Sequence, residues 1–211
     1  MKIITINRDA PEISRLQECA RALQDNSMAA YPTDTFYGLG GNPFARELVE
    51  KIYRVKRRSR EKPLILLLGN MHQFESFTKD SPAFADRLTR VFWPGPLTLV
   101  LKASEAVPGF LQGEGETIAV RIPGCPVILE LVKMCGFPLT GSSANLSGHP
   151  SPDSVQAIAP EILKQMDLVI DAGKTGTSCG STIVDCTGDH PVVLREGVVP
   201  RESLAPGENA G

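Results

Sequence analysis

The 211-residue chain lacks the features that mark several large classes of protein. Its five cysteines never form a C-x-x-C pair, which argues against a structural zinc site or a disulfide framework. Its three histidines are isolated from one another and from the cysteines, so we expect no metal held by a side-chain motif. The longest apolar run, Leu64 to Leu68, is too short to cross a bilayer, and the first residues meet charge at Arg8. We therefore expect a cytoplasmic protein with no signal-peptide core and no membrane partner.

An excess of charge of one sign is also lacking. The 22 basic and 24 acidic residues give a formal net charge of −2. The whole molecule is not a polycation, so any attraction for nucleic acid must come from a local patch. The length suits one domain, and 42% hydrophobic with 22% charged residues is ordinary for a globular protein.

Hydrophobic spacing predicts strands and helices that alternate early, with strands clustered late. We expect strands at 2–6, 28–31, 64–68, 97–102, 117–121, 139–141, 168–171, 182–185 and 192–194. We expect helices at about 13–23, 46–56, 71–77, 83–92, 127–135 and 153–164. The stretch from 32 to 43 is expected to be a loop. This order predicts one α/β domain over 1–200, with a mixed sheet flanked by helices and a flexible C-terminal tail at 201–211.

A basic segment stands where a helix should give way to a buried strand. It contains a single acid, Glu61, among the cations Lys51, Arg54, Lys56, Arg57, Arg58, Arg60 and Lys62. Lys56 and Arg58 alternate, so they could point together into a cleft. A solvated helix end is the alternative, because cations favour the C-terminal end of a helix dipole. The direct lead into a buried strand favours phosphate binding, since α/β proteins place ligands at strand ends.

Neutral hydrogen-bonding groups gather in a second segment, Gly141-Ser-Ser-Ala-Asn-Leu-Ser-Gly148. It follows an apolar strand and offers hydroxyl and amide groups. Its residues are also those of an ordinary turn. Its glycine spacing is neither that of a P-loop nor that of a dinucleotide fingerprint. Together with the basic segment, however, it supplies the two kinds of group that a polyphosphate requires.

Four further positions border strands and carry polar or charged groups. Asp34 follows a strand and could bind magnesium or an amine, or cap a turn. Arg121 ends a strand beside an apolar interior, which predicts a carboxylate partner from a ligand or from the protein itself. Ser181 and Arg195 border late strands, where each could simply satisfy backbone groups.

These segments occur in one order, and the ordered set is similar to a known family. The motifs are Pro32-Thr-Asp-Thr-x-Tyr-Gly-Leu39, Lys56-x-Arg58, Lys62-Pro-Leu64, Trp93-Pro-Gly-Pro-Leu-Thr98, Ala119-Val-Arg-Ile-Pro123, Ser143-Ala-Asn-Leu-Ser-Gly148, Gly180-Ser-Thr-Ile-Val-Asp185 and Leu194-Arg195. Over roughly residues 10 to 200 the chain resembles the YrdC-like family of threonylcarbamoyl-AMP synthases. Any one motif is weak, but their order is specific.

The resemblance implies an α/β fold whose twisted sheet has a concave basic cleft. It also implies that L-threonine, bicarbonate and ATP give threonylcarbamoyl-AMP and pyrophosphate. ATP with Mg²⁺, held through the phosphates, would be a substrate, with no tightly bound cofactor. Downstream tRNA threonylcarbamoyl transferase proteins would modify the adenosine beside the anticodon, and the basic cleft becomes a candidate contact for tRNA or double-stranded RNA.

The family's functional residues match positions of this chain. The resemblance assigns catalysis to Lys56, Arg58, Ser143 and Asn145. It assigns threonine binding to Thr35, Arg121, Ser143 and Ser181. It assigns ATP binding to Arg58, Lys62, Thr117, Asn145, Ser151, Asp153 and Arg195. Two departures stand out: Lys62 replaces the asparagine of many members, and Leu67 stands where longer members carry a histidine near threonine. Longer members also carry an extra C-terminal domain that this sequence does not show, so we expect the chain to be of the short, single-domain type.

Two other functions remain as alternatives at this point. A paralogue with the same fold could bind RNA through its basic patch, or act on a different acyl-adenylate. The complete set of threonine and S-x-N positions argues against it, because an RNA-binding module does not need them. A carbamoyl transfer domain of a larger maturation enzyme is disfavoured by length, since no zinc-finger or acylphosphatase-like segment accompanies the chain.

Overall fold

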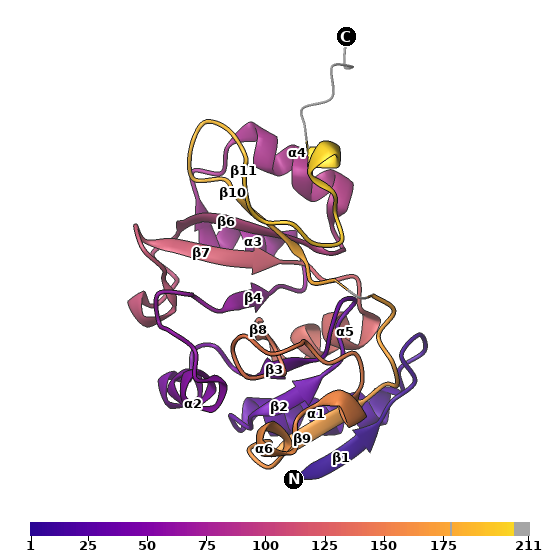
Figure 1. The fold of residues 1–211 in the computed structure, drawn as a ribbon. Helices are drawn as coiled ribbons and strands as arrows, with labels where there is room; N and C mark the ends of the chain where they lie inside the picture. The colour runs from indigo at the N-terminus through magenta and orange to yellow at the C-terminus, as the bar shows by residue number, and fades with distance from the viewer. Residues whose placement is uncertain (178, 205–211) are drawn as a thin grey trace.

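The computed structural model describes residues 1–177 and 179–204, and within them eleven strands form one sheet. The strands are β1 (Lys2–Thr5), β2 (Ala29–Tyr31), β3 (Gly38–Gly40), β4 (Ile65–Leu67), β5 (Thr78–Lys79), β6 (Leu97–Ala103), β7 (Thr117–Arg121), β8 (Leu139–Ser143), β9 (Leu168–Asp171), β10 (Thr182–Asp185) and β11 (Val192–Arg195). Their order across the sheet is β1-β9-β2-β3-β8-β4-β7-β6-β10-β11, with β5 added beside β6 (Figure 1).

Parallel and antiparallel pairs are mixed along this sheet. Strands β1 and β2 both run parallel to β9, β4 runs parallel to β7, and β10 runs parallel to β6. The central strand β8 is antiparallel to both of its neighbours, β3 and β4. This mixed sheet confirms the predicted fold class.

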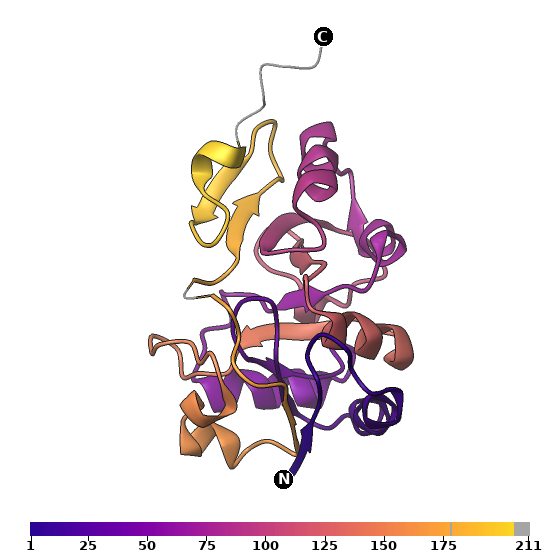
Figure 2. The ribbon, with the colours of Figure 1, turned by 90° about the vertical axis from the view of Figure 1, so that its right-hand side faces the viewer.

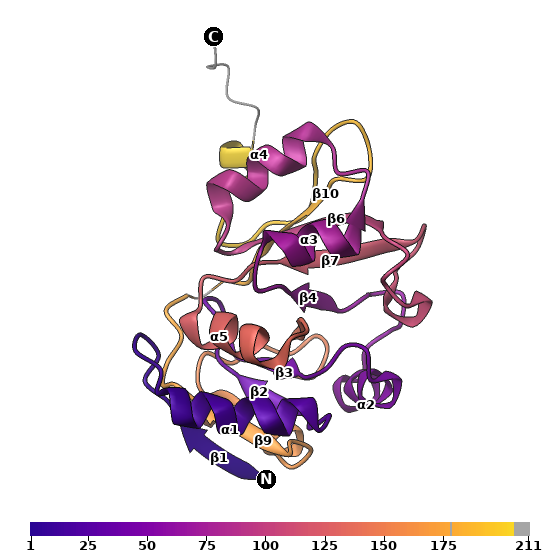
Figure 3. The ribbon, with the colours of Figure 1, turned by 180° about the vertical axis from the view of Figure 1, so that it is seen from behind.

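Helices cover one face of the sheet more fully than the other. The helices are α1 (Ile13–Gln24), α2 (Arg46–Lys56), α3 (Met71–Phe77), α4 (Ala83–Phe92), α5 (Pro126–Cys135) and α6 (Pro160–Leu163), with 3₁₀ turns η1 (Gly109–Leu111), η2 (Val155–Ala157) and η3 (Arg201–Leu204). Seen from behind, α1, α3, α4 and α5 lie over the sheet (Figure 3). The side view places α6 and the β10–β11 hairpin toward the opposite face (Figure 2). Within the described residues, no helix is long and apolar enough to cross a membrane.

Alternating side chains divide the core between the two faces of the sheet. In β9, Leu168 and Ile170 join one buried cluster with α1 and α5, while Val169 joins the other. Strand β2 does the same with Ala29 and Ala30. Because successive side chains of a strand point to opposite faces, both faces are buried here.

Helix α2 ends within the predicted basic segment, at Lys56. Arg57 takes a left-handed conformation with φ of 49°, and its backbone N–H closes the last turn. A left-handed residue after the last helical residue is a common way to stop a helix. The chain therefore turns at this point and leads into β4.

Strand β3 was not predicted, because it consists of glycines around Leu39 and lies in the stretch expected to be a loop. Its backbone packs closely against β2 and β8. A Cβ atom on Gly40 would lie 1.9 Å from Oγ1 of Thr140 and 2.7 Å from the hydroxyl of Tyr31. The Tyr31 hydroxyl in turn donates to the carbonyl of Thr140. Position 40 must therefore be glycine, because Thr140 and Tyr31 leave no room for a Cβ atom.

The predicted single helix at 153–164 is wrong. The chain forms the short η2 and α6 instead, separated by Ala159 in an extended conformation with ψ of 136°. Pro160 explains the break, because proline lacks a backbone N–H and disfavours the helical conformation of the residue before it. The predicted tail begins with η3, whose Leu204 is buried, and its remainder at 205–211 lies outside the described residues.

The close packing at Gly40 predicts a large effect of a single methyl group. Gly40→Ala should lower the free energy of unfolding by about 3 kcal/mol, because the fixed Thr140 backbone cannot move aside. Gly188→Ala is the matched control, since a Cβ there meets nothing within 4 Å. Urea unfolding of both variants measures the difference, and equal stabilities would contradict the proposed packing.

Candidate functional site

A cleft of about 1080 Å³ gathers most of the residues singled out in the sequence. Those from the N-terminal half and β7 that line it are Thr35, Arg58, Lys62, Thr117 and Arg121. Those from the C-terminal half are Ser143, Ser151, Ser181 and Arg195. Lys56, Asn145 and Asp153 do not line it. Segments more than a hundred residues apart therefore meet in one hollow.

The floor of the cleft is apolar. It is formed by side chains from β4, β6, β7 and β10, namely Ile65, Leu67, Val100, Ala119 and Ile183. Leu67 packs over Gly141, where a Cβ would lie 2.8 Å from a Leu67 methyl group. The polar and charged groups therefore stand around a floor that excludes water.

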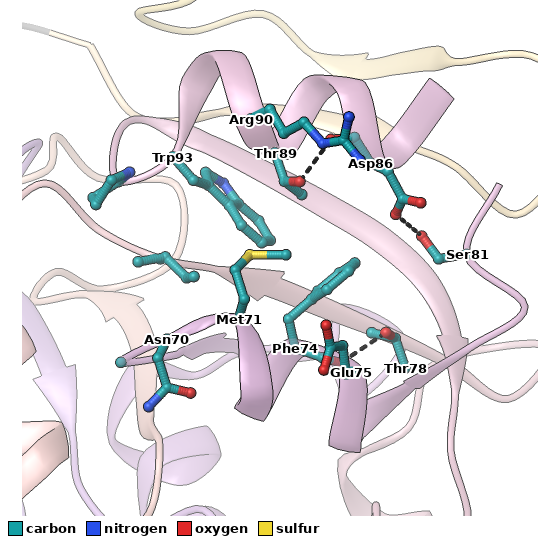
Figure 4. Close-up of a pocket in the computed structure, with 13 residues that line it drawn as sticks. Asn70, Met71, Phe74, Glu75, Thr78, Ser81, Asp86, Thr89, Arg90 and Trp93 are labelled. Atoms are coloured by element: carbon teal, nitrogen blue, oxygen red, sulfur yellow. Dashed lines mark hydrogen bonds between the residues drawn. The ribbon is translucent and has the colours of Figure 1, made fainter. Parts of the chain in front are cut away.

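A second hollow, of about 730 Å³, lies between α3 and α4. Figure 4 shows Met71 and Phe74 of α3 pointing toward Trp93 at the end of α4. The Phe74 and Trp93 rings meet edge to face, with centroids 5.4 Å apart. The residues around this hollow include none of the predicted catalytic or binding residues, so the larger cleft is the candidate site.

Arg58 lines the cleft and has no carboxylate partner in the described part of the chain. Its Nε donates to the carbonyl of Lys62 at 2.8 Å, and its Nη2 donates to the carbonyl of Pro63 at 3.0 Å. Burial lowers the pKa of this guanidinium, which shows that its charge is poorly solvated. Such a charge favours an anion.

Lys56 differs from the prediction that it points into a cleft beside Arg58. Its side chain is only 1% exposed, and its Nζ donates to the carbonyls of Ser143 and Asn145 and to Oδ1 of Asn145. Burial, and then the charge of Arg58, lowers the pKa of Lys56 to about 7. Lys56 therefore ties the end of α2 to the segment after β8.

The segment after β8 is held by its own hydrogen bonds. Ser143 donates its hydroxyl to Oδ1 of Asn145 at 2.6 Å, and Nδ2 of Asn145 donates to the carbonyl of His149. Asp153, further along, pairs with Lys174 at 3.1 Å. Asn145 and Asp153 thus bond to the protein, while Ser143 faces the cleft.

Arg121 has the carboxylate partner that the sequence predicted, and it is the protein's own Asp34. The two form a buried ion pair, with side chains 5% and 13% exposed. Nε of Arg121 also donates to the carbonyl of Gly95 at 2.9 Å, and its Nη1 donates to the hydroxyl of Thr35 at 3.4 Å. Nothing local in the sequence pairs residues 34 and 121, so this role of Asp34 was missed.

Ser181 and Arg195 lie together at another part of the cleft. The Ser181 hydroxyl lies 2.8 Å from the hydroxyl of Thr98, and Arg195 donates to the Ser181 carbonyl at 2.7 Å. Burial lowers the pKa of Arg195, followed by the charges of Arg58 and Arg121. The charges of Arg58 and Arg121 therefore reach the guanidinium of Arg195. Within 1–177 and 179–204, neither Arg58 nor Arg195 forms an ion pair.

Other lining residues were not singled out in the sequence. Lys102 donates to the carbonyl of Gly115 at 2.8 Å, and Asp185 accepts from the hydroxyl of Thr187 at 2.7 Å. Each stands two residues from a floor residue on the same strand, so the period-two pattern could have placed them on this face. In the part of the chain that the structure describes, no three His, Cys, Asp or Glu side chains gather as a metal-binding group.

Comparison with known proteins gives consistent matches over the whole chain. A family model described as "Sua5_yciO_yrdC: Telomere recombination" matches residues 21–197. Threonylcarbamoyl-AMP synthase of Pyrococcus abyssi is 37% identical over 204 residues, which are 97% of this chain but 60% of that protein. Threonylcarbamoyl-AMP synthase of Vibrio cholerae is 33% identical over 187 residues, which cover 88% of this chain and 98% of that protein.

The solved structures agree with these sequence matches. The crystal structure of P. abyssi Sua5 complexed with L-threonine superposes with a TM-score of 0.91 at 36% identity, over 97% of this chain and 60% of that one. The chain thus spans about 60% of the length of its P. abyssi relative and nearly all of the Vibrio one. A family model matches most of the chain, and two relatives are more than 30% identical to it. The chain therefore belongs to the Sua5/YciO/YrdC family.

Proposed function

We propose that this protein is a nucleotidyltransferase that forms threonylcarbamoyl-AMP and pyrophosphate from L-threonine, bicarbonate and ATP. The observation that carries the proposal is one cleft with two kinds of arginine. Among the residues that the structure describes, Arg58 and Arg195 have no carboxylate partner, whereas Arg121 is paired with Asp34. The names of the P. abyssi and V. cholerae relatives support the same activity.

The unpaired arginines suit the phosphates of ATP. Burial is the largest cause of the lowered pKa of Arg195, and repulsion between Arg195 and Arg58 adds to it. A polyphosphate between them would relieve this repulsion and accept hydrogen bonds from both guanidinium groups. Lys62, with its exposed ammonium, and Ser143 and Thr117, with their hydroxyls, would complete this end. Mg²⁺ would enter with the ATP phosphates, where it would neutralise charge.

The paired arginine suits the carboxylate of threonine. Arg121 is nearly buried, and the hydroxyls of Thr35 and Ser181 line the cleft with it. Leu67, which stands where longer members carry a histidine, offers an apolar wall to the threonine methyl group. A carboxylate at Arg121 would leave the threonine amine directed toward the open cleft.

The reaction needs no protein nucleophile. The threonine amine and bicarbonate give a carbamate and water, and a carbamate oxygen then attacks the α-phosphorus of ATP. The bond from the α-phosphorus to the bridging oxygen breaks, and pyrophosphate leaves with the electron pair. Residues of the cleft would act by positioning and by stabilising charge, as in other phosphoryl-type transfers.

Lys56 supports this chemistry from below the surface of the cleft. Its three hydrogen bonds hold the carbonyls of Ser143 and Asn145, so it fixes the position of the Ser143 hydroxyl. In this proposal Lys56 and Asn145 are positioning residues, and Arg58 and Ser143 contact the phosphates. Ser151 lines the same cleft, while Asp153 acts through its ion pair with Lys174.

The product would serve tRNA modification beside the anticodon, through separate transferase proteins. An RNA-binding paralogue is the alternative function, and the exposed cations of the basic segment are its basis. Lys51 and Arg60 are already paired with Asp167 and Glu50. This leaves a thin patch of charge for an RNA backbone outside the cleft.

Product analysis tests the proposed reaction directly. Mass spectrometry of a mixture of the protein, ATP, threonine, bicarbonate and magnesium should reveal threonylcarbamoyl-AMP, with pyrophosphate in equal amount. Omission of threonine should abolish both products. Salt-sensitive RNA binding without any threonine-dependent ATP consumption would instead favour the RNA-binding function.

Arg58 should be the most sensitive residue of the phosphate end. Arg58→Ala should lower the rate of adenylate formation on the order of 10²-fold, because an uncompensated charge in a water-poor site stabilises the transition state strongly. Arg54→Ala is the control, since Arg54 is exposed on α2, shortly before Arg58 in the sequence, and lines no part of the cleft. Steady-state kinetics of both variants decide this, and a wild-type rate for Arg58→Ala would exclude the assigned role.

The buried Lys56 predicts a pH dependence of stability. Its pKa of about 7 lies below the ordinary lysine value of 10.5, so between these values the unfolded chain binds a proton that the folded protein lacks. The contribution of Lys56 to the free energy of unfolding should therefore increase from about pH 7 to about pH 10, and be lost below pH 7. Urea unfolding across this range should show the increase in the wild type and not in Lys56→Met. If the free energies of unfolding of the two proteins changed with pH in the same way, the prediction would be contradicted.

A further inference from the structure

Asp34 holds the guanidinium of Arg121 without lining the cleft itself. Arg121 is gripped on two sides, with Nη2 paired to Oδ1 of Asp34 and Nε donating to the carbonyl of Gly95. Its remaining nitrogen, Nη1, is directed to the hydroxyl of Thr35, which does line the cleft. Contacts with residues outside the cleft lining therefore set the orientation of the Arg121 guanidinium.

Within the described residues, Asp34 forms an ion pair with Arg121 and with no other cation. Its Oδ2 atom is buried and has no hydrogen-bond partner in the described part of the chain. The Asp34 side chain is 13% exposed, so water screens this carboxylate weakly. A buried, weakly screened carboxylate cancels most of the positive charge that Arg121 would present to the cleft.

The turn behind the pair is built to allow this arrangement. Gly95 offers its carbonyl to Arg121, and a Cβ at this position would lie 2.4 Å from the carbonyl of Phe92. Gly124 lies against Oδ2 of Asp34, since a Cβ there would be 3.5 Å from that oxygen. Two glycines therefore bring backbone close to both partners.

The other two arginines of the cleft have no such partner in residues 1–177 and 179–204. Arg58 donates to the carbonyls of Lys62 and Pro63, and Arg195 donates to Ser181. An anion in the cleft therefore meets two arginines that form no ion pair within the described residues, Arg58 and Arg195, and one whose charge is compensated, Arg121. This difference sorts anions by charge, because a polyphosphate gains more from full charges than a monocarboxylate does.

We infer that Asp34 is a positioning residue that determines selectivity: it neutralises Arg121, so that the part of the cleft around Arg121 accepts a singly charged carboxylate and rejects polyphosphate. The carboxylate is that of an amino acid only if the proposed function holds. The division of charge itself follows from the contacts of Asp34, Arg121, Arg58 and Arg195.

Asp34→Asn tests the inference, because asparagine keeps an oxygen acceptor for Arg121 but removes the charge. The measurement is isothermal titration calorimetry of the full chain with threonine and inorganic pyrophosphate, in the absence of ATP. The wild type should bind one pyrophosphate, and threonine should bind beside it. The variant should bind a second pyrophosphate that threonine displaces, so that pyrophosphate weakens threonine binding on the order of tenfold or more.

Two variants serve as controls. Asp34→Glu keeps the negative charge and should retain a single pyrophosphate site, which a purely structural requirement for aspartate would not predict. Glu50→Gln removes the carboxylate of the exposed pair with Arg60, outside the cleft, and should leave both ligands unaffected.

Several results would overturn the inference. One is a folded Asp34→Asn protein that still binds a single pyrophosphate, whether or not it keeps threonine. Another is displacement of threonine by pyrophosphate in the wild type, and this decides the matter even where the variant does not fold. A wild type that binds pyrophosphate but no threonine would refute the proposed function instead, while the second pyrophosphate site would still test Asp34.

Discussion

The position of strand β8 between β3 and β4 is the constraint on which the rest of the structure depends. It joins the half of the sheet that holds β1, β9, β2 and β3 to the half that holds β4, β7, β6, β10 and β11. Missing side chains make this join possible, because Cβ atoms on Gly40 and Gly141 would collide with Thr140 and Leu67. With the strands this close, the segment after β8 faces the cleft, and Lys56 of α2 binds it from below.

The distribution of positive charge in the cleft depends on which of its arginines form an ion pair. A buried ion pair contributes little to stability, because desolvation offsets the attraction between its charges. The pair of Arg121 with Asp34 is better explained by what it does for ligands, since it leaves Arg58 and Arg195 as the uncompensated charges of the cleft. An apolar floor beneath these groups strengthens each interaction by excluding water.

Much of the fold could be predicted from periodicity. The bounds predicted for α2, α3, α4, β7, β9 and β10 agree with the structure. The prediction failed where local patterns mislead. Strand β3 is made of Gly38 and Gly40 around one leucine, and its identity comes from neighbouring strands. The helix predicted over 153–164 had a good apolar pattern, but Pro160 interrupts it.

The sequence by itself indicated the family, and most of the site residues that it predicted line the cleft, because residue types and their order are written along the chain. Only the tertiary structure decided what each side chain does. Lys56 and Arg58 are two residues apart, yet one is buried against the segment after β8 and the other faces the cleft. Asp34 and Arg121 are far apart in sequence, yet they form one buried pair. The direction in which a side chain points and the residue with which it pairs depend on how distant strands pack. No local pattern of residues encodes that packing.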